Sequence, residues 1–418
     1  ACVRVCVCVS PMGGGRCVPA TLWEVACPRR PLGACAFRPL GAAGTHAAPT
    51  PPGAKDAKKA KPNAPDAGKI EEAAKALAEA KCPQIFVGGG AIGAGEQIAQ
   101  LAETLNAPIT PSIHGGYGVV DSRHPNMFSQ VGAHHWWQQS DVIVAIGTRL
   151  SPAIPAWGFN PKEQTIIRID IDPEELVRHT IPQLHIHGDA NDSVTAINNS
   201  IERYMNGPAP DRSDLFEKIR NEVAKEVDLV KPQKEITDVI RSEVGEDGIL
   251  VSDLTQCYYA SHDNYPTYKP RTYIHPGFQG TLGHCVATSL GAKVGNPDVP
   301  VVALCGDGGF AFTMTELMTA AKYQIGVIFL VVNDNTYGNV KRIMNANYGG
   351  RVFCADLVNP NYQKLADAFS MGSAKVNNPK DLQKEMKRLL AAGGPAIIEY
   401  EAGEFPNPWH LYHRKKVR

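Results

Sequence analysis

The chain has 418 residues, which is enough for two or three ordinary domains. Its 42 lysines and arginines balance its 42 aspartates and glutamates, and this zero formal charge argues against nucleic acid or an anionic membrane surface as a main partner. The apolar runs all fall short of the roughly 20 residues that a membrane-spanning helix needs, and the composition is that of a globular protein.

Residues 1–68 do not show the pattern of a folded domain, and we expect them to be irregular or disordered. Glu24 is their only acidic residue before Asp56, and the stretch 47–66 is rich in Pro, Ala and Lys. Six of the eleven cysteines lie here without a C-x-x-C pair, which favours a reducing, cytoplasmic environment. An organellar transit peptide is the alternative for this acid-poor start, although serine is nearly absent.

Residues 69–206 alternate amphipathic helices with short apolar strands. "GKIEEAAKALAEAKCPQIFVGGG" predicts a helix and a buried strand that ends in glycines, and "GEQIAQLAETLNAPITPSI" repeats this order. "SDVIVAIGTRL" and "TIIRIDIDP" predict two more strands, and "SVTAINNSIERYM" predicts a closing helix. This alternation implies a central α/β domain with a parallel, doubly wound sheet.

A linker, 207–231, follows and includes a charged helix near Leu215–Val230. Residues 232–405 form a second α/β domain, with strands "GILVSD", "VPVVALC", "GVIFLVVN" and "PAIIEYE" and with helices near Thr281–Val294, Thr315–Tyr323 and Pro379–Leu390. Residues 406–418 are an aromatic and basic tail. The predicted fold class is therefore α/β, with two doubly wound parallel-sheet domains after a disordered N-terminal segment.

The strand "VPVVALC" runs directly into Gly306, Asp307, Gly308 and Gly309. A strand that ends in glycines before a helix leaves backbone N–H groups free to bind a phosphate. The Asp307 carboxylate would repel that phosphate unless a cation stood between them, and Mg²⁺ accepts carboxylate and phosphate oxygens together. By itself, a Gly-Asp-Gly turn is weak evidence for such a site, because it is more often a purely structural turn.

The next apolar strand ends in "NDNTYGN", residues 333–339. Neighbouring parallel strands end at the same edge of a sheet, so Asp334 can supply a second oxygen ligand there. The backbone carbonyl of Thr336 can supply a third, and diphosphate and water oxygens would complete the coordination.

The combination "GDGGF…EL…VVNDNTYGN" resembles the thiamine diphosphate signature, which opens with Gly-Asp-Gly and closes with Asn-Asn. The resemblance implies that Asp307, Asp334 and the Thr336 carbonyl bind Mg²⁺. It implies cofactor-binding residues in both motifs, namely Gly306, Asp307, Gly308, Gly309, Asn333, Asp334, Thr336, Tyr337 and Gly338. The sequence departs from the family at Asp334, where the second Asn usually stands, and the extra charge should strengthen the dependence on Mg²⁺.

Upstream, "PGFQGTLGHCVATSLGAKVGNP" resembles the family's turn and helix that line the thiazolium ring. Gly280, Thr281, Leu282 and Gly283 match its Gly-Thr-Met-Gly version. In the family a bulky apolar residue bends the cofactor so that its 4′-amino group meets the reactive carbon, and Leu282 has that position. The structural alternative is a helix N-terminus with Thr281 as its cap and Leu282 in the core.

Residues 69–206 resemble the middle domain of acetolactate synthase-like enzymes, with "VGGGAIGAG", "HGGYGVVDSRHPN", "AIGTRL" and "IDIDPEE" in the family's order. Some members hold FAD there, and Gly88–Gly90 could then admit its pyrophosphate and Asp170 or Asp172 its ribose. The sequence after "GTR" lacks the family's usual charged continuation, so FAD is not favoured. A nearby run is expected to pack the start of a helix: His134, His135, Trp136 and Trp137.

The resemblance, over residues 69–410, implies a thiamine diphosphate- and Mg²⁺-dependent decarboxylase or carboligase that acts on a small 2-oxo acid, most like acetolactate synthase. The alternatives are an oxalyl-CoA or benzoylformate decarboxylase-like enzyme, an aldehyde carboligase, and a catalytically silent thiamine diphosphate-binding fragment. A nicotinamide dehydrogenase would need a G-x-G-x-x-G turn, which "GGGAIGAG" only approximates.

In the resembled family a glutamate of an N-terminal pyrimidine-binding domain hydrogen-bonds the pyrimidine ring and promotes proton removal from the thiazolium. That domain needs more than roughly 100 residues, whereas only residues 1–68 precede the central domain here. We therefore expect an incomplete chain that is inactive alone and has no assigned catalytic residue, since Glu24 lacks a flanking strand and helix. For the complete enzyme the resemblance implies a homodimer or homotetramer.

Overall fold

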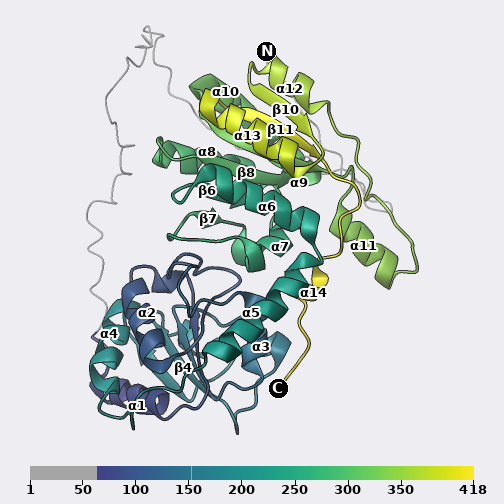
Figure 1. The fold of residues 1–418 in the computed structure, drawn as a ribbon. Helices are drawn as coiled ribbons and strands as arrows, with labels where there is room; N and C mark the ends of the chain where they lie inside the picture. Colours follow the sequence, from purple (N-terminus) through teal and green to yellow (C-terminus); the bar gives the residue numbers. More distant parts are fainter. Residues whose placement is uncertain (1–63, 152) are drawn as a thin grey trace, which may run out of the picture. The chain divides into compact units, whose positions relative to one another are not determined.

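The computed structural model describes residues 64–151 and 153–418. It contains two α/β units, each built on a parallel sheet, which confirms the fold class for this part of the chain (Figure 1). Of the irregular segment predicted for residues 1–68, only residues 64–68 are described, and helix α1 (Ala67–Ala78) already begins among them. Glu24 lies outside the described residues. No helix within the two described ranges is long and apolar enough to cross a membrane.

The first sheet has five parallel strands in the order β2-β1-β3-β4-β5. The strands are β1 (Pro83–Val87), β2 (Ile109–Pro111), β3 (Val142–Ile146), β4 (Thr165–Asp170) and β5 (Leu184–His187). Strand β1 lies between β2 and β3, with Ile85 opposite Ile109 and Val144. Both β1 and β3 are buried at every position, which is why their sequences are almost unbroken apolar runs.

Helices cover both faces of this sheet. On one face α1, α2 (Gly95–Leu105) and α4 (Ala190–Ile201) pack against side chains such as Ile85 and Val144. On the other face α3 (Gln130–Trp137) and a π-helical turn (Ala153–Trp157) pack against Phe86.

The histidine and tryptophan run lies in the second half of α3, not at the start of a helix as expected. Both indoles are fully buried, and each donates a hydrogen bond to a backbone carbonyl, Trp136 to Pro83 at 3.1 Å and Trp137 to Gly158 at 2.8 Å. His134 donates from Nε2 to the carbonyl of Lys415, and His135 pairs with Glu226. These side chains therefore hold the packing around α3.

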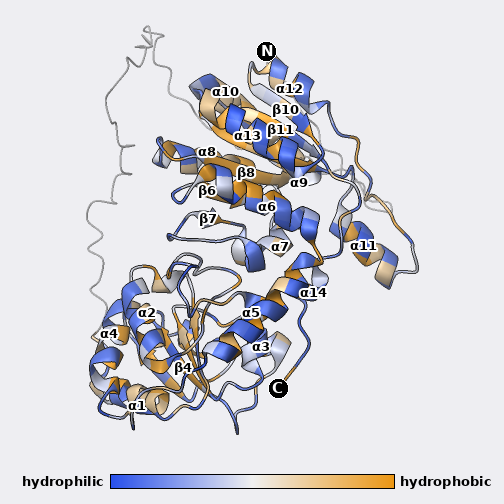
Figure 2. Cartoon of the chain, viewed as in Figure 1, coloured by the Kyte–Doolittle hydropathy of each residue, from blue (hydrophilic) through white to orange (hydrophobic). Residues whose placement is uncertain are grey.

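The second sheet has six parallel strands in the order β10-β11-β9-β8-β6-β7. The strands are β6 (Ile249–Ser252), β7 (Tyr273–Ile274), β8 (Val301–Gly306), β9 (Val327–Asn333), β10 (Gly372–Val376) and β11 (Ala396–Glu401). Helices α6 (Lys231–Val244) and α13 (Pro379–Ala392) pack on one face, and α8 (His284–Gly295), α10 (Leu317–Tyr323) and α12 (Tyr362–Ala368) pack on the other. Strand β8 is apolar throughout its buried part, whereas helices such as α13 mix apolar and polar positions (Figure 2).

The remaining α-helices of the described residues are α5 (Ser213–Asp228), α7 (Gln256–Asn264), α9 (Asp307–Thr313), α11 (Gly338–Asn347) and α14 (Trp409–Tyr412). Helix α5 occupies most of the predicted linker and buries Phe216 and Ile219 against Trp136 and Phe128. The end of the C-terminal tail is also fixed, because the backbone N–H groups of Val417 and Arg418 donate to the carbonyl of Trp157.

Three strands were not predicted from the sequence, and each lies at an edge of its sheet: β5, β7 and β10. Edge strands have solvent on one side, so they need no continuous apolar run. Strand β10, "GSAKV", is buried only at Val376, and β7 has only two residues. A search for apolar runs finds the central strands and passes over such edges.

The second sheet reverses its order at β6, because β7 lies on one side of β6 and β8 and β9 lie on the other. The carboxyl ends of β6, β8 and β9 are therefore neighbours. In open α/β sheets, a crevice that can accept a ligand forms outside the carboxyl ends of the strands at such a reversal.

Candidate functional site

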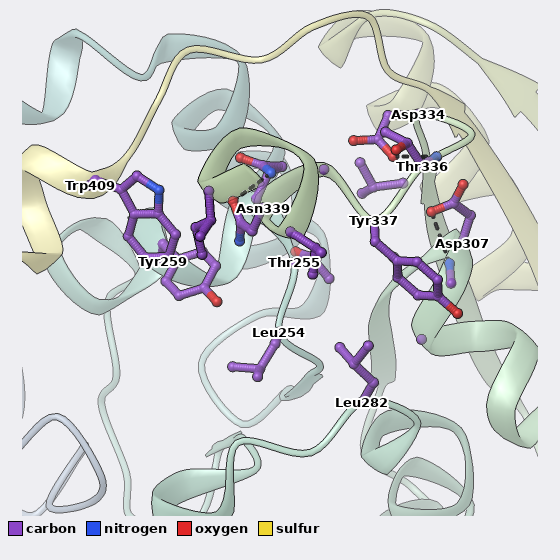
Figure 3. Close-up of a pocket in the computed structure, with 18 residues that line it drawn as sticks. Leu254, Thr255, Tyr259, Leu282, Asp307, Asp334, Thr336, Tyr337, Asn339 and Trp409 are labelled. Carbon is purple, nitrogen blue, oxygen red and sulfur yellow. Dashed lines mark hydrogen bonds between the residues drawn. The ribbon is translucent and has the colours of Figure 1, made fainter. Parts of the chain in front are cut away.

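A cavity of about 280 Å³ opens at this reversal (Figure 3). Its walls come from the residues after β6, from the turn before α8, from the ends of β8 and β9, and from α11 and α14. The lining residues are Leu254, Thr255, Gln256, Tyr259, Leu282, Gly306, Asp307, Gly308, Gly309, Val332, Asp334, Thr336, Tyr337, Gly338, Asn339, Val340, Ile343 and Trp409. The structure thus brings together the two sequence motifs, which lie on adjacent strands.

Asp307 is the first residue after β8 and is only 3% exposed. Its Oδ1 accepts a hydrogen bond from the backbone N–H of Gly308 at 2.9 Å, and its Oδ2 accepts one from Nδ2 of Asn359 at 2.7 Å. Burial raises the pKa of Asp307, and these two hydrogen bonds act in the opposite direction. The carboxylate is therefore oriented by its neighbours without being neutralised by a cationic side chain.

Asp334 follows the last residue of β9 and faces the same cavity. The pKa of Asp334 is raised to about 6, mainly by burial and then by the nearby charge of Asp307, while Arg342 acts in the opposite direction. The buried carboxylate of Asp307 and the half-buried carboxylate of Asp334 thus lie close enough for their charges to interact. The described residues hold no cluster of three or more His, Cys, Asp or Glu side chains that could bind a metal, so a cation between this pair would need carbonyl, ligand or water oxygens as well.

Asn333 ties the end of β9 to its surroundings. Its Nδ2 donates to Glu399 at 2.8 Å, and its Oδ1 accepts from Asn359 at 2.9 Å. Asn359 also donates to Asp307, so the side-chain amide of Asn359 links the ends of β8 and β9. Asn333 does not line the cavity; it holds the residues that do.

Two hydrogen bonds to the carbonyl of Ala355 fix the turn after β9. Thr336 Oγ1 donates to the carbonyl of Ala355 at 2.7 Å, and the backbone N–H of Tyr337 donates to the same carbonyl at 2.8 Å. The Tyr337 ring then closes on Gly308, where an added Cβ would lie 2.3 Å from Cε1 of the ring. At Gly338 an added Cβ would lie 2.7 Å from Oδ2 of Asp334. Both glycines are required by close packing beside the two carboxylates.

The turn before α8 places Leu282 at the cavity, where it is 36% exposed (Figure 3). The helix starts three residues later than predicted, because Gly280 and Gly283 have φ values of +59° and +80° that a helix cannot contain. The N-cap residue is Gly283 and has no side-chain cap, so the alternative with Thr281 as cap and Leu282 in the core is wrong. Gly280, Thr281 and Gly283 form the turn but do not line the cavity.

Several residues at this site were missed by sequence reasoning. Asp253 and its neighbours after β6 could have been found, because "GILVSD" is a buried strand that ends in a carboxylate, as β8 does. Asn359 and Trp409 carried no signal, since they lie far along the chain from both motifs. The others are Leu254 and Thr255, which lie between β6 and α7, and residues of the helices that flank the cavity: Gln256, Tyr259, Asn339, Val340 and Ile343.

A second cavity, of about 290 Å³, lies at the first sheet and contains the residues considered for a flavin, Gly88–Gly90 and Asp170 but not Asp172. An added Cβ at Gly88 would lie 2.1 Å from the carbonyl oxygen of Gly147, and an added Cβ at Gly90 would lie 2.9 Å from the Cα of Gly147. The packing of β1 against β3 therefore accounts for these two glycines without a nucleotide.

Both α/β units match known protein families. The model of the thiamine pyrophosphate enzyme central domain matches residues 70–197, and the model of the C-terminal thiamine pyrophosphate-binding domain matches residues 253–400. The second match spans the ends of β6, β8 and β9, where the first cavity lies.

Curated relatives agree with these matches. The acetolactate synthase large subunit of Haemophilus influenzae is 30% identical over 345 residues, which cover 78% of this chain and 59% of the relative. The probable acetolactate synthase large subunit of Methanococcus aeolicus is 27% identical over 361 residues (79% and 60%). A probable 2-ketoarginine decarboxylase of Pseudomonas aeruginosa is 29% identical over 343 residues (79% and 60%). The chain thus spans about 60% of the length of these relatives. With both domain models matched in order and with these relatives, the chain belongs to the thiamine pyrophosphate enzyme family and is acetolactate synthase-like.

Proposed function

We propose that the cavity at β6, β8 and β9 binds the diphosphate end of thiamine diphosphate, with Mg²⁺ bound by Asp307, Asp334 and the backbone carbonyl of Thr336. The observation that carries this proposal is the pair of carboxylates on adjacent strand ends, the buried Asp307 and the half-buried Asp334, each with a raised pKa. A partly buried anion pair without a cation costs free energy, and a hard divalent cation that also accepts phosphate oxygens would offset that cost.

The remaining residues of the two motifs fit a diphosphate. Gly306, Gly308 and Gly309 present backbone at the end of β8 without side chains, and Gly338 does the same beside Asp334. Such a surface allows phosphate oxygens to approach backbone N–H groups. Asn333 and Tyr337 would act on the cofactor by holding this surface, as their contacts indicate.

When bound, thiamine diphosphate supplies a thiazolium that serves as an electron sink for a 2-oxo acid. The chain's own residues bind and orient it. Leu282, presented by the turn of Gly280, Thr281 and Gly283, would contact the thiazolium side, because it is the apolar side chain that this turn places in the cavity.

We assign domains on this basis. Residues 69–206 form the central domain, 207–231 connect it, 232–405 form the diphosphate-binding domain, and 406–418 form the tail. The extent of each sheet and the two matched ranges, 70–197 and 253–400, support these boundaries. FAD is not part of the proposal.

We infer that the complete enzyme acts on pyruvate or a similarly small 2-oxo acid and forms a carbon–carbon bond. The similarity of both units to acetolactate synthase large subunits supports this inference. Similarity to a probable 2-ketoarginine decarboxylase favours a second candidate, decarboxylation without bond formation. Product analysis with pyruvate separates the two, since acetolactate supports the first and an aldehyde as the main product supports the second.

No described residue that lines the cavity is a glutamate. The carboxylate that acts on the pyrimidine ring would then come from outside the described residues or from another chain, and the described residues alone would not turn over substrate. Apolar side chains exposed near the turn before α8, Leu282, Phe312 and Met318, favour a homodimer or homotetramer as the working form.

The binding proposal is tested by calorimetric titration of the purified chain with thiamine diphosphate, with Mg²⁺ or with EDTA. We expect binding only with Mg²⁺. Asp307→Ala should abolish it, because a central metal ligand is lost, and Asp334→Asn should retain it, because an amide oxygen can still bind the metal. Asp172→Ala, a carboxylate change at the first sheet, is the control. Equal, Mg²⁺-dependent affinity in Asp307→Ala and the parent chain would show that the site is wrongly assigned.

A further inference from the structure

Asp253 is a carboxylate to which the proposed function gives no role, and it lies directly beneath the cavity. It follows β6 and is 1% exposed. Its Oδ2 accepts a hydrogen bond from the backbone N–H of Gly283 at 2.8 Å. An added Cβ at Gly309 would lie 2.5 Å from the same oxygen. The carboxylate therefore lies against both the turn that carries Leu282 and the turn that carries Asp307.

The surroundings of Asp253 do not favour its charge. Burial raises the pKa of Asp253 to about 6, and the opposing groups are the backbone amides of Gly283, Leu254 and His284. Within the described part of the chain, Oδ1 has no hydrogen-bond partner. An ionised carboxylate in such a place lowers stability, so its contribution to folding does not explain its presence.

The contacts of Gly283 show what the carboxylate holds. Gly283 begins α8 and has no side chain with which to cap the helix. Asp253 binds its N–H, and Thr313 Oγ1 donates to its carbonyl at 2.9 Å. The backbone N–H of Gly283 is thus bound by the residue that follows β6, and the carbonyl of Gly283 is bound by the last residue of α9. Leu282 is the next residue back along the chain, and it faces the cavity beside Leu254 (Figure 3).

We propose that Asp253 is a positioning residue for the cofactor, which holds Gly283, and through it Leu282, in register with the turn of Gly306–Gly309. This inference rests on the proposed function, because the position of Leu282 matters only when the cofactor fills the cavity. Asp253 would then be retained for the alignment of two cofactor-binding turns, at a cost in stability.

A second aspartate offers a matched control. Burial also raises the pKa of Asp263 to about 6, and Asp263 also accepts a backbone hydrogen bond at 2.8 Å, from Val131. Asp263 does not line the cofactor cavity. Replacing either aspartate by Asn removes one buried charge of similar character, but only one of the two changes touches the turn of Gly283.

The experiment compares Asp253→Asn, Asp263→Asn and the parent chain at pH 8 by three measurements: urea unfolding, calorimetric titration with thiamine diphosphate and Mg²⁺, and amide hydrogen exchange of residues 280–284 without cofactor. For Asp253→Asn we expect unfolding no easier than in the parent, faster exchange at 280–284, and about tenfold weaker cofactor binding, the loss expected for one hydrogen bond to a charged group. Asp263→Asn should bind the cofactor as the parent does. A damaged fold would lower the stability as well, so it would not explain weaker binding at unchanged stability.

The route through Leu282 is tested by a double-mutant cycle. If Asp253 acts by placing this side chain, Asp253→Asn and Leu282→Ala together should weaken binding by less than the sum of their separate effects. Parental cofactor affinity in Asp253→Asn overturns the inference, and so do strictly additive effects in the cycle. A parent chain that fails to bind thiamine diphosphate with Mg²⁺ overturns the proposed function itself, and this inference with it.

Discussion

At the scale of single residues, glycines shape the proposed cofactor site as much as the charged side chains do. Gly308 has no room for a Cβ because the Tyr337 ring occupies that space, and Gly338 has none because Asp334 does. Gly89, in the cavity of the first sheet, has nothing within 4 Å of an added Cβ. Close packing therefore requires glycine in one of two similar strand-to-helix turns but not in the other. Substitution by alanine distinguishes the two cases.

We predict that Gly308→Ala weakens thiamine diphosphate binding and lowers the free energy of unfolding by about 1–3 kcal/mol, the usual cost of overpacking, because the Tyr337 ring must move. Gly89→Ala should change the free energy of unfolding by less than about 0.5 kcal/mol and leave cofactor affinity unchanged. Urea unfolding and calorimetric titration of both variants measure these effects. Equal consequences at the two positions would contradict the packing argument.

At the scale of elements, the site depends on three neighbouring strands and on a short helix from the far end of the chain. Helix α14 brings Trp409 to the cavity wall, where its ring lies 4.7 Å from that of Tyr259 between centroids. The other tryptophans that the structure describes, Trp136, Trp137 and Trp157, are buried in the first unit. Trp409 is therefore the described indole placed to report on the contents of the cavity.

We predict that thiamine diphosphate with Mg²⁺ changes the intrinsic tryptophan fluorescence, and that Trp409→Phe removes most of this change. Calorimetric affinity of the same variant should stay close to that of the parent, because phenylalanine keeps an aromatic ring beside Tyr259. A full fluorescence change in Trp409→Phe would mean that the cofactor occupies another place.

At the scale of the whole molecule, buried titratable groups make stability depend on pH in two opposing ways. Burial lowers the pKa of His275 from 6.5 to about 4, whereas burial raises the pKa of Asp253 and of Asp263 from 3.8 to about 6. Between pH 6.5 and 4 the unfolded chain binds a proton at His275 that the folded chain does not, so this group lowers stability as pH falls. The two aspartates act in the opposite direction, because there the folded chain binds the extra proton.

We predict that His275→Gln removes an acid-induced loss of up to about 3 kcal/mol from the free energy of unfolding between pH 6.5 and 4. Glutamine can still accept the backbone hydrogen bond of Gly277 that the imidazole Nδ1 accepts. The free energy of unfolding is measured by urea unfolding at several pH values. The difference between variant and parent at each pH cancels the contribution of the aspartates. His413→Gln, at an exposed position, is the control for the loss of a histidine elsewhere in the chain.

The sequence by itself determined the order of helices and central strands and the two motifs at the ends of β8 and β9. Both are local properties. A strand covered on two faces needs a continuous apolar run, and a turn beneath a phosphate needs glycine whatever lies elsewhere in the chain. The family resemblance follows from the same short segments, and the matched domains confirm it.

Only the tertiary structure decided which further residues meet at the site. Asp253, Asn359 and Trp409 come from three separate segments. Strand order and helix packing bring Asp253 to Gly283, Asn359 to Asp307 and Trp409 to the cavity wall. The tertiary structure also decided the edge strands, which depend on solvent exposure on one side, and the start of α8, which depends on glycines with positive φ. Long-range contacts of this kind leave no periodic pattern in a sequence, since each depends on which strand lies beside which.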